Sequence, residues 1–318
     1  KVFGQYAIHR GFYHEAKALS GLTAQVVVRC ISKVADAYKL DKKSKRTFRP
    51  LGSIAYDDRI IRWYVDRSEV SIWADGGRER IPFVCGDRQR NLLASRQGES
   101  DLVFSDGDFY LLATCNAVDP PPSLVKDFLG VDLGITNIAV DSEGQEFSGG
   151  TVKGLRYRNA RLRGTLQAKG TKSAKRLLKK RRRKESRFAR HENHCISKKL
   201  VAKAKDTGRG IALEDLKGIR TRTTVRKAQR RIQHSWSFFQ LRAFIEYKAR
   251  LAGVPVVLVD PRNTSRTCPA CGCVDKANRP TQSLFLCVKC SYSANADFNA
   301  AENIRRAAVN RPYADVAD

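Results

Sequence analysis

The chain has 318 residues, with 60 Lys and Arg against 32 Asp and Glu, a net charge of +28 and a hydrophobic content of 42%. This length and hydrophobic content are typical of a folded chain with two or three modules, and they argue against general disorder. So large a positive charge repels itself in the compact state, so it predicts a polyanionic partner. No apolar run is long enough to span a bilayer and no secretory signal is visible, so we expect no membrane partner.

Residues 1–45 are predicted to be helical. Thr23 is a plausible N-cap, and apolar residues follow it at helical spacing as far as Tyr38. The stripe is best interpreted as core. Because the chain begins with Lys1 and contains no Met, we expect further residues upstream.

Residues 46–118 change to short alternating segments, at 60–65, 70–74 and 81–84. Turn sequences lie between or beside these segments at 75–77 and 106–107. The pattern predicts a small β module, either a barrel or a strongly bent sheet. Oligonucleotide binding and a purely structural role are equally compatible with it.

Three prolines at 120–122 predict a stiff boundary. After it, residues 128–147 predict the opening of a three-stranded meander, with Asp132 in the middle of its first strand. Two further buried strands are predicted at 210–214, ending in Glu214, and at 254–259. A helix of about 235–252 between them completes a β-α-β unit, which implies a parallel pair.

Two basic clusters interrupt this pattern. Residues 151–190 contain 17 Lys and Arg and one acid, Glu185, and Gly170 predicts a break between two helices. Residues 220–231 contain six bases and no acid, followed by Trp236, Phe238 and Phe239. Charge this concentrated favours contact with a phosphate backbone over a merely solvated face. The aromatics could stack on bases, but we expect at least two of them in a helix core.

Four cysteines form two CxxC pairs, Cys268 with Cys271 and Cys287 with Cys290, separated by 15 residues. Two such pairs predict a tetrahedral Zn²⁺ site closed to substrate, which can stabilise a segment too small for its own core. A redox pair is a weaker interpretation, because that motif normally occurs once. Cys273 completes neither pair and is left out of the predicted site.

Three carboxylates form the second metal-ligand pattern. Asp132 and Glu214 lie on apolar strands and Asp297 lies near a predicted helix start. Carboxylates on apolar strands are costly without a partner, and Mg²⁺ or Mn²⁺ would suit their hard oxygen ligands. Two such ions could assist phosphodiester hydrolysis. Any one of the three could instead be a cap or an ion-pair partner, and for Asp297 alone capping is the simpler interpretation.

At these residues the chain resembles the TnpB family, relatives of the single-effector type V CRISPR nucleases. The resemblance covers roughly residues 20–308. It depends on five segments in order: 49–56 (RPLGSIAY), 130–138 (GVDLGITNI), 210–217 (GIALEDLK), 264–272 (TSRTCPACG) and 294–304 (ANADFNAAENI).

The resemblance implies an RNA-guided DNA endonuclease of the α+β multi-module class, with an RNase H-like (RuvC) α/β nuclease domain that contains a zinc-ribbon insert. The expected parts are a helical recognition-type segment at 1–45, a β-barrel wedge-type module at 46–118, nuclease segments at 119–266 and 292–318, and the zinc ribbon at 267–291. Asp132, Glu214 and Asp297 match the three catalytic positions. Guide RNA and target double-stranded DNA are the implied partners, in the cytoplasm of a prokaryote at the nucleoid.

Three alternatives remain open. A nuclease-inactive relative could act as an RNA-guided repressor, although all three matching carboxylates are present. A guide-free RuvC-type resolvase would share the carboxylates but would need neither the zinc ribbon nor the basic insert. Strand transfer by a transposase is compatible with the carboxylates, but the resemblance points away from it.

Overall fold

The computed structural model describes residues 3–217 and 238–310. The chain divides into two compact units, residues 1–118 and 119–318. Within the described ranges no helix combines the length and the apolar character that a bilayer-spanning segment needs.

The first unit begins with two packed helices, α1 (Gln5–Ser20) and α2 (Ala24–Leu40). Their contact buries Ile8 against Val27 and Ile31. The predicted apolar stripe is therefore core, as expected. Thr23 does occupy the N-cap of α2, but its side chain makes no capping hydrogen bond.

Six strands and two short helices follow in residues 3–118. The elements are β1 (Ile54–Tyr56), β2 (Ile61–Tyr64), η1 (Val65–Arg67), β3 (Glu69–Ala74), β4 (Gly77–Pro82), α3 (Asp87–Leu93), β5 (Arg96–Ser105) and β6 (Asp108–Cys115). The strands pair as two antiparallel three-stranded sheets, β1-β5-β6 and β2-β3-β4. Side chains from both sheets share one core around Tyr56, Ile61 and Ile72.

This module differs from the sequence expectation in part. A barrel or a strongly bent sheet was expected, and the hydrogen-bonded strands form two three-stranded sheets. The expectation lacked α3, which has seven residues, none of them buried, and so carries no apolar stripe to reveal it. The third predicted strand, 81–84, is in fact β4, which starts at Gly77 because Gly76 and Gly77 turn with positive φ.

The second unit is built on a five-stranded sheet, in the order β11-β10-β7-β8-β9 within the described residues. The strands are β7 (Phe128–Asp132), β8 (Asn137–Asp141), β9 (Glu146–Ser148), β10 (Gly210–Glu214) and β11 (Val256–Val259). β8 pairs antiparallel with both β7 and β9. β10 pairs parallel with both β7 and β11. The meander and the parallel β-α-β unit are both as predicted.

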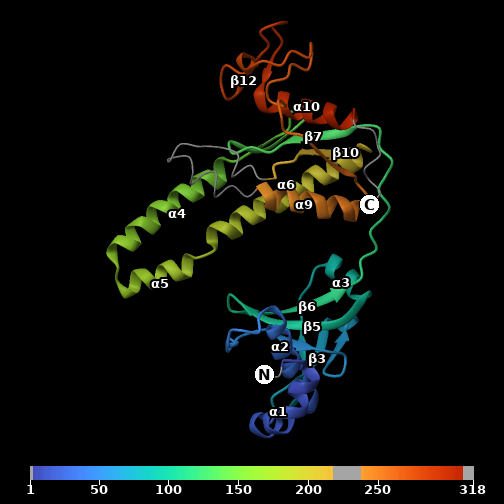
Figure 1. Ribbon diagram of the computed structural model, residues 1–318, viewed down its shortest axis with the longest axis vertical. Helices are drawn as coiled ribbons and strands as arrows, with labels where there is room; N and C mark the ends of the chain where they lie inside the picture. The colour runs from blue at the N-terminus through green and yellow to red at the C-terminus, as the bar shows by residue number, and fades with distance from the viewer. Residues whose placement is uncertain (1–2, 218–237, 311–318) are drawn as a thin grey trace. The chain divides into compact units, whose positions relative to one another are not determined.

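Helices cover both faces of this sheet (Figure 1). One face packs on α6 (Lys184–Asp206) and α9 (Phe238–Ala252) through side chains such as Leu129, Leu213 and Ile245. The other packs on α10 (Ala296–Val309) through Phe128, Ala212 and Ile304. Because both faces are covered, β7 and β10 are apolar almost throughout, as is typical of parallel strands.

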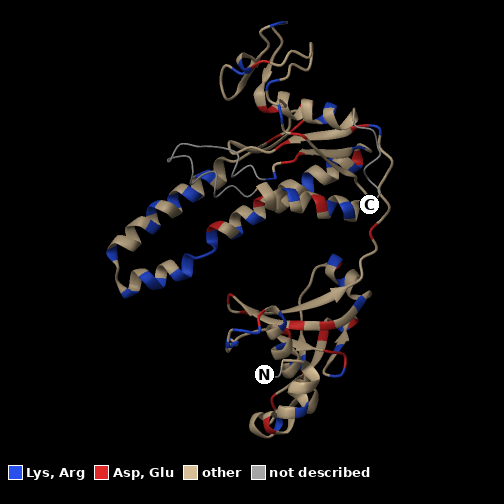
Figure 2. Ribbon diagram, in the orientation of Figure 1, with Lys and Arg blue, Asp and Glu red and all other residues tan. Residues whose placement is uncertain are grey.

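After β9 the chain forms a basic arm, residues 150–190. It consists of α4 (Gly150–Lys169), α5 (Lys172–Arg181) and the start of α6. Lys and Arg lie along the whole of α4 and α5 (Figure 2). The break at Gly170 is confirmed, with φ of +63°. A second break at Arg183, φ +72°, was not predicted, because nothing in a run of basic residues distinguishes it.

The remaining elements form a cysteine lobe, residues 267–291, that leads into α10. It contains η2 (Lys276–Asn278) and β12 (Leu284–Leu286), and β12 pairs with β13 (Ser293–Asn295) just before α10. The Ala296 N–H donates to the Ser283 carbonyl at 2.9 Å. The start of α10 is therefore tied directly to the cysteine lobe.

Candidate nuclease centre and cysteine site

Two of the three predicted carboxylates lie side by side on the sheet. β7 and β10 pair in parallel with Val131 opposite Leu213, so the next residues, Asp132 and Glu214, are level with each other. Side chains alternate along a strand, and Phe128 and Ala212 mark the face that α10 covers. Asp132 and Glu214 share that face. Asp132 is the last residue of β7 rather than its middle, so it lies at the carboxyl edge of the parallel strands.

Asp297 lies on the first turn of α10, the helix that covers the face shared by Asp132 and Glu214. The helix cap is made by Asn295, whose side chain accepts from the N–H groups of Asp297 and Phe298. The capping interpretation of Asp297 is therefore wrong, and its carboxylate is available for another role. At the opposite end of the contact with β7, Arg305 pairs with Asp127 at 2.9 Å.

A glycine sets how closely α10 approaches β7. A Cβ at Gly130 would lie 2.6 Å from the Arg305 backbone nitrogen and would collide with the Ala301 carbonyl oxygen. Gly130 precedes Asp132 by two residues on the same face, and Asp297 precedes Ala301 by one helical turn. The bare backbone at Gly130 therefore lets Asp297 approach Asp132.

We expect Gly130→Ala to lower the free energy of unfolding by about 1–3 kcal/mol, because the added methyl overpacks the contact between helix and strand. Urea unfolding measures this change. Gly164→Ala is the control, because a Cβ at Gly164 meets nothing within 4 Å. Equal stability of the two variants would contradict this account of the contact.

Neighbouring polar groups hold two of the carboxylates. The Thr264 hydroxyl donates to Glu214 at 2.5 Å, and the Thr264 backbone carbonyl accepts from the buried Asn303 amide at 2.8 Å. Asp297 accepts from the Asn137 amide at 3.3 Å and pairs with Arg279 of the cysteine lobe at 3.7 Å. These contacts orient the carboxylates before any ligand is present.

The electrostatics at Asp132 and Glu214 favour a bound cation. Burial raises the pKa of Asp132 to about 8, helped by the charges of Glu214 and Asp297 and opposed by Arg279. Burial also raises the pKa of Glu214, although the hydrogen bond from Thr264 lowers it in part. A divalent cation would relieve this repulsion, and hard oxygen ligands fit Mg²⁺ or Mn²⁺.

The pKa of Asp132 predicts how metal-free stability depends on pH. The folded pKa lies above the unfolded value of roughly 3.9, so the contribution of this proton is lost as pH rises through about 8. We expect the free energy of unfolding in a chelator to fall between about pH 5 and pH 8.5, on the order of a few kcal/mol.

Urea unfolding across this pH range measures the effect. Asp132→Asn removes the titrating group and should flatten the profile, and Mn²⁺ should do the same in the wild-type chain. A wild-type profile in chelator that matches the Asp132→Asn profile would contradict this assignment.

The four predicted cysteines form one tight cluster. Their sulfur atoms all lie within 4.8 Å of one another, and no other group in the described ranges brings together three or more possible metal ligands of this kind. The pairs Cys268–Cys290 and Cys271–Cys287 are each 3.6 Å apart. A tetrahedral site with bonds of about 2.3 Å has sulfurs ~3.8 Å apart, so the cluster fits Zn²⁺. The carboxylate oxygens of Asp132, Glu214 and Asp297 do not lie as close to one another as these sulfur atoms do.

One buried amide joins the two halves of the cysteine lobe. The Asn278 side chain donates to the carbonyls of Arg266 and Cys273 and accepts from the Val288 N–H. Burial alone would raise the pKa of Cys287, but the N–H groups of Cys290 and Lys289 lower it to about 6. Despite a backbone hydrogen bond that lowers it, neighbouring cysteines raise the pKa of Cys290 to about 12 in turn, so one proton is shared within the cluster, and zinc binding would release it.

Sequence reasoning missed the supporting residues. Asn137 and Thr264 lie inside segments that carried the family resemblance, yet no role was predicted for them. Arg279 lies in a segment without periodicity or a motif. Their contacts join segments distant in the chain, so no local pattern could have identified them.

The expectation that at least two of the three aromatics lie in a helix core is tested for two of them. Phe238 is buried in the core against α6, whereas Phe239 is 42% exposed. Trp236 and the basic cluster at 220–231 lie outside the described residues.

Comparison with known proteins gives these sites a context. Residues 238–304 match the family model described as Cas12f1-like, TNB domain. The TnpB-like protein MJ0751 of Methanocaldococcus jannaschii is 37% identical over 131 residues, 41% of this chain and 46% of that protein. The chain is a relative of the TnpB proteins.

Two further relatives carry nuclease names. A CRISPR-associated endodeoxyribonuclease Cas12f1 of Sulfoacidibacillus thermotolerans is 40% identical over 124 residues, 39% of this chain and 28% of the relative. A putative RNA-guided DNA endonuclease, InsQ of Escherichia coli K12, is 28% identical over 221 residues, 63% of this chain and 54% of InsQ. The matched regions thus cover between 28% and 54% of the length of these three proteins.

Among solved structures, this TnpB relative is similar to CasPhi-2 (Cas12j) bound to crRNA, with a TM-score of 0.49 and 14% sequence identity. The similarity covers 85% of this chain and 65% of CasPhi-2.

Proposed function

We propose that the chain is an RNA-guided DNA endonuclease, a hydrolase that cleaves phosphodiester bonds at Asp132, Glu214 and Asp297. The observation that carries the proposal is that three carboxylates from distant parts of the chain lie on one face of the sheet. They are close enough for the charges of Glu214 and Asp297 to raise the pKa of Asp132. Relatives named as RNA-guided or CRISPR-associated DNA endonucleases support the substrate and the guide.

We assign the second unit to the RNase H-like (RuvC) class. In support, three antiparallel strands lead into two parallel ones, and the carboxylates lie on a central pair and on a flanking helix. The cysteine lobe would be the zinc ribbon inserted before the last carboxylate. The division into parts at 1–45, 46–118, 119–266, 267–291 and 292–318 belongs to the same proposal.

In this assignment Asp132, Glu214 and Asp297 hold Mg²⁺ or Mn²⁺, which when bound would activate a water and stabilise the leaving oxygen. Thr264 orients Glu214, and Asn137 and Arg279 orient Asp297, so the ligands are set before metal arrives. Cys268, Cys271, Cys287 and Cys290 hold Zn²⁺ and fix the start of α10, which carries Asp297.

The positive charge of the basic arm indicates nucleic-acid partners. The basic arm carries 17 Lys and Arg against one acid, so it would contact the phosphates of guide RNA or target DNA. An enzyme of this kind would work in the cytoplasm of a prokaryotic cell, at the nucleoid. A nuclease-inactive repressor has no observation in its favour, because all three carboxylates are in place.

The experiment that tests the proposal is sequencing of the nucleic acid that copurifies with the chain made together with its native flanking locus. A single structured RNA with a defined 3′ segment is expected. Heterogeneous RNA that moderate salt removes would mean that the net charge of +28 binds nonspecifically. A guide-free nuclease would then be the better account.

A further inference from the structure

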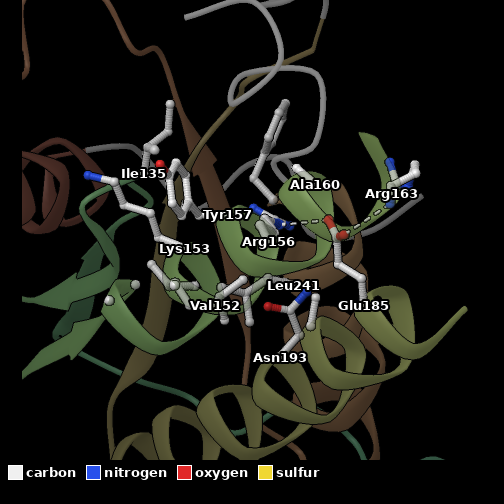
Figure 3. Close-up of a pocket in the computed structure, with 16 residues that line it drawn as sticks. Ile135, Val152, Lys153, Arg156, Tyr157, Ala160, Arg163, Glu185, Asn193 and Leu241 are labelled. Carbon is white, nitrogen blue, oxygen red and sulfur yellow. Dashed lines mark hydrogen bonds and ion pairs between the residues drawn. The ribbon is translucent and has the colours of Figure 1, made fainter. Parts of the chain in front are cut away.

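A cavity of about 500 Å³ lies on the side of the sheet that α6 and α9 cover (Figure 3). It is formed by the first turns of α4, by α6 and α9, and by the turn between β7 and β8. Its volume falls within the range of roughly 300–1,000 Å³ that is typical of small-ligand sites.

The interior and the rim of the cavity differ in chemistry. Val152, Ala189 and Leu241 line it and are buried, and the buried Asn193 adds one amide to an otherwise apolar interior. At the rim, Tyr157 is 66% exposed and Lys153 follows Val152 on the same helix. An exposed aromatic ring beside a cation and an apolar hollow is the combination that stacks a nucleobase and contacts its phosphate.

One wall of the cavity is fixed by the single acid of residues 151–190. Glu185 pairs with Arg163 at 3.4 Å and with Arg156 at 3.7 Å, and thereby joins α4 to α6 (Figure 3). Glu185 engages both arginines of this wall, so Lys153 at the rim is the cation better placed to meet a phosphate. A nucleotide would therefore place its phosphate toward Lys153 and its base in the cavity.

The cavity and the carboxylates lie on two sides of one turn. Ile135 lines the cavity, and Asn137, two residues later, donates to Asp297. The Cα atoms of these two residues are at most about 7 Å apart, so a strand of a few nucleotides held at Asp297 could extend round the turn to the cavity.

We propose that this cavity binds an unstacked base of the single DNA strand that enters the carboxylate centre, with Tyr157 as the stacking platform. The inference rests on the proposed nuclease function. It adds a positioning site that would hold the strand in register with Asp132, Glu214 and Asp297.

The test is photocrosslinking with a short single-stranded DNA that contains 5-iodo-2′-deoxyuridine, in Ca²⁺ to prevent cutting. Mass spectrometry locates the crosslinked residue, and fluorescence polarisation gives the affinity. We expect a crosslink at Tyr157. Tyr157→Phe should retain affinity within about twofold, whereas Tyr157→Ala should lose about 5- to 100-fold, the range for one aromatic–base stack.

A matched glycine pair on α4 separates cavity filling from other effects. Gly154 lines the cavity and Gly164 does not, and a Cβ at either meets nothing within 4 Å. Both changes to Leu should favour the helix. We expect Gly154→Leu to weaken strand binding and remove the crosslink, and Gly164→Leu to leave both unchanged.

Crosslinks that map elsewhere, or equal behaviour of the two glycine variants, would overturn the proposal. Failure of the nuclease function is distinguishable. A Tyr157 crosslink in a chain that cuts no DNA leaves the base site standing and removes the endonuclease. Cutting without this crosslink removes the base site alone.

Discussion

Asp132→Asn should abolish DNA cutting while leaving nucleic-acid binding intact. Losing this ligand forfeits several kcal/mol of metal-assisted stabilisation, so we expect cleavage to fall about a thousandfold. The fold should not suffer, because Asp132 is held near two like charges and its pKa is raised to about 8. Metal-free stability at pH 8 should rise while activity disappears.

The matched control is Asp215→Asn. Asp215 follows Glu214 directly but pairs with Arg242 at 3.0 Å, away from the other carboxylates. Cutting by this variant should stay within about threefold of wild type, because an exposed ion pair contributes little to stability. Cleavage rates on a labelled duplex measure both variants. Normal cutting by Asp132→Asn would show that the catalytic centre lies elsewhere.

Loss of zinc should have the second large effect. The core of the cysteine lobe is small, centred on Phe285, Cys268 and Cys287, so we expect the lobe to depend on the ion for its fold. Structural zinc contributes about 10–16 kcal/mol in zinc-finger peptides. Cys287→Ser should abolish zinc retention and loosen the start of α10, which would lower cutting about tenfold or more through Asp297 and Arg279.

Cys273→Ser is the control for the zinc prediction. Cys273 packs against the lobe but is not one of the four clustered ligands. Metal analysis should find one zinc per chain in the wild type and in Cys273→Ser, and none in Cys287→Ser. If Cys273→Ser also loses its zinc, the ligand assignment is wrong.

The predicted site residues could be proposed from the sequence because each stands out locally. Strand β10 was predicted residue for residue, since four apolar residues end in a single acid, Glu214. The four cysteines could be recognised from their CxxC spacing alone, and the structure brings the two pairs together. The order of β7, β8 and β9 followed from short turns rich in glycine.

What the sequence could not provide depends on contacts between distant segments. Arg279 reaches Asp297 across a lobe that has no periodicity, and Asn137 reaches Asp297 from 160 residues away. The break at Arg183 and the pairing of six strands into two sheets depend on packing. The sequence does not show why position 130 is a glycine, because the reason is the close approach of α10, which is distant in the chain.

The most direct test of the central claim compares cutting of two DNA duplexes by the purified chain in Mg²⁺. One duplex matches the 3′ segment of the RNA that copurifies with the chain, and the other carries the same bases in scrambled order. Both are flanked by a randomised library of neighbouring sequence. The account predicts cleavage of the matched DNA alone, abolished in Asp132→Asn. Equal cutting of both duplexes, or no cutting of either with RNA bound, would contradict it.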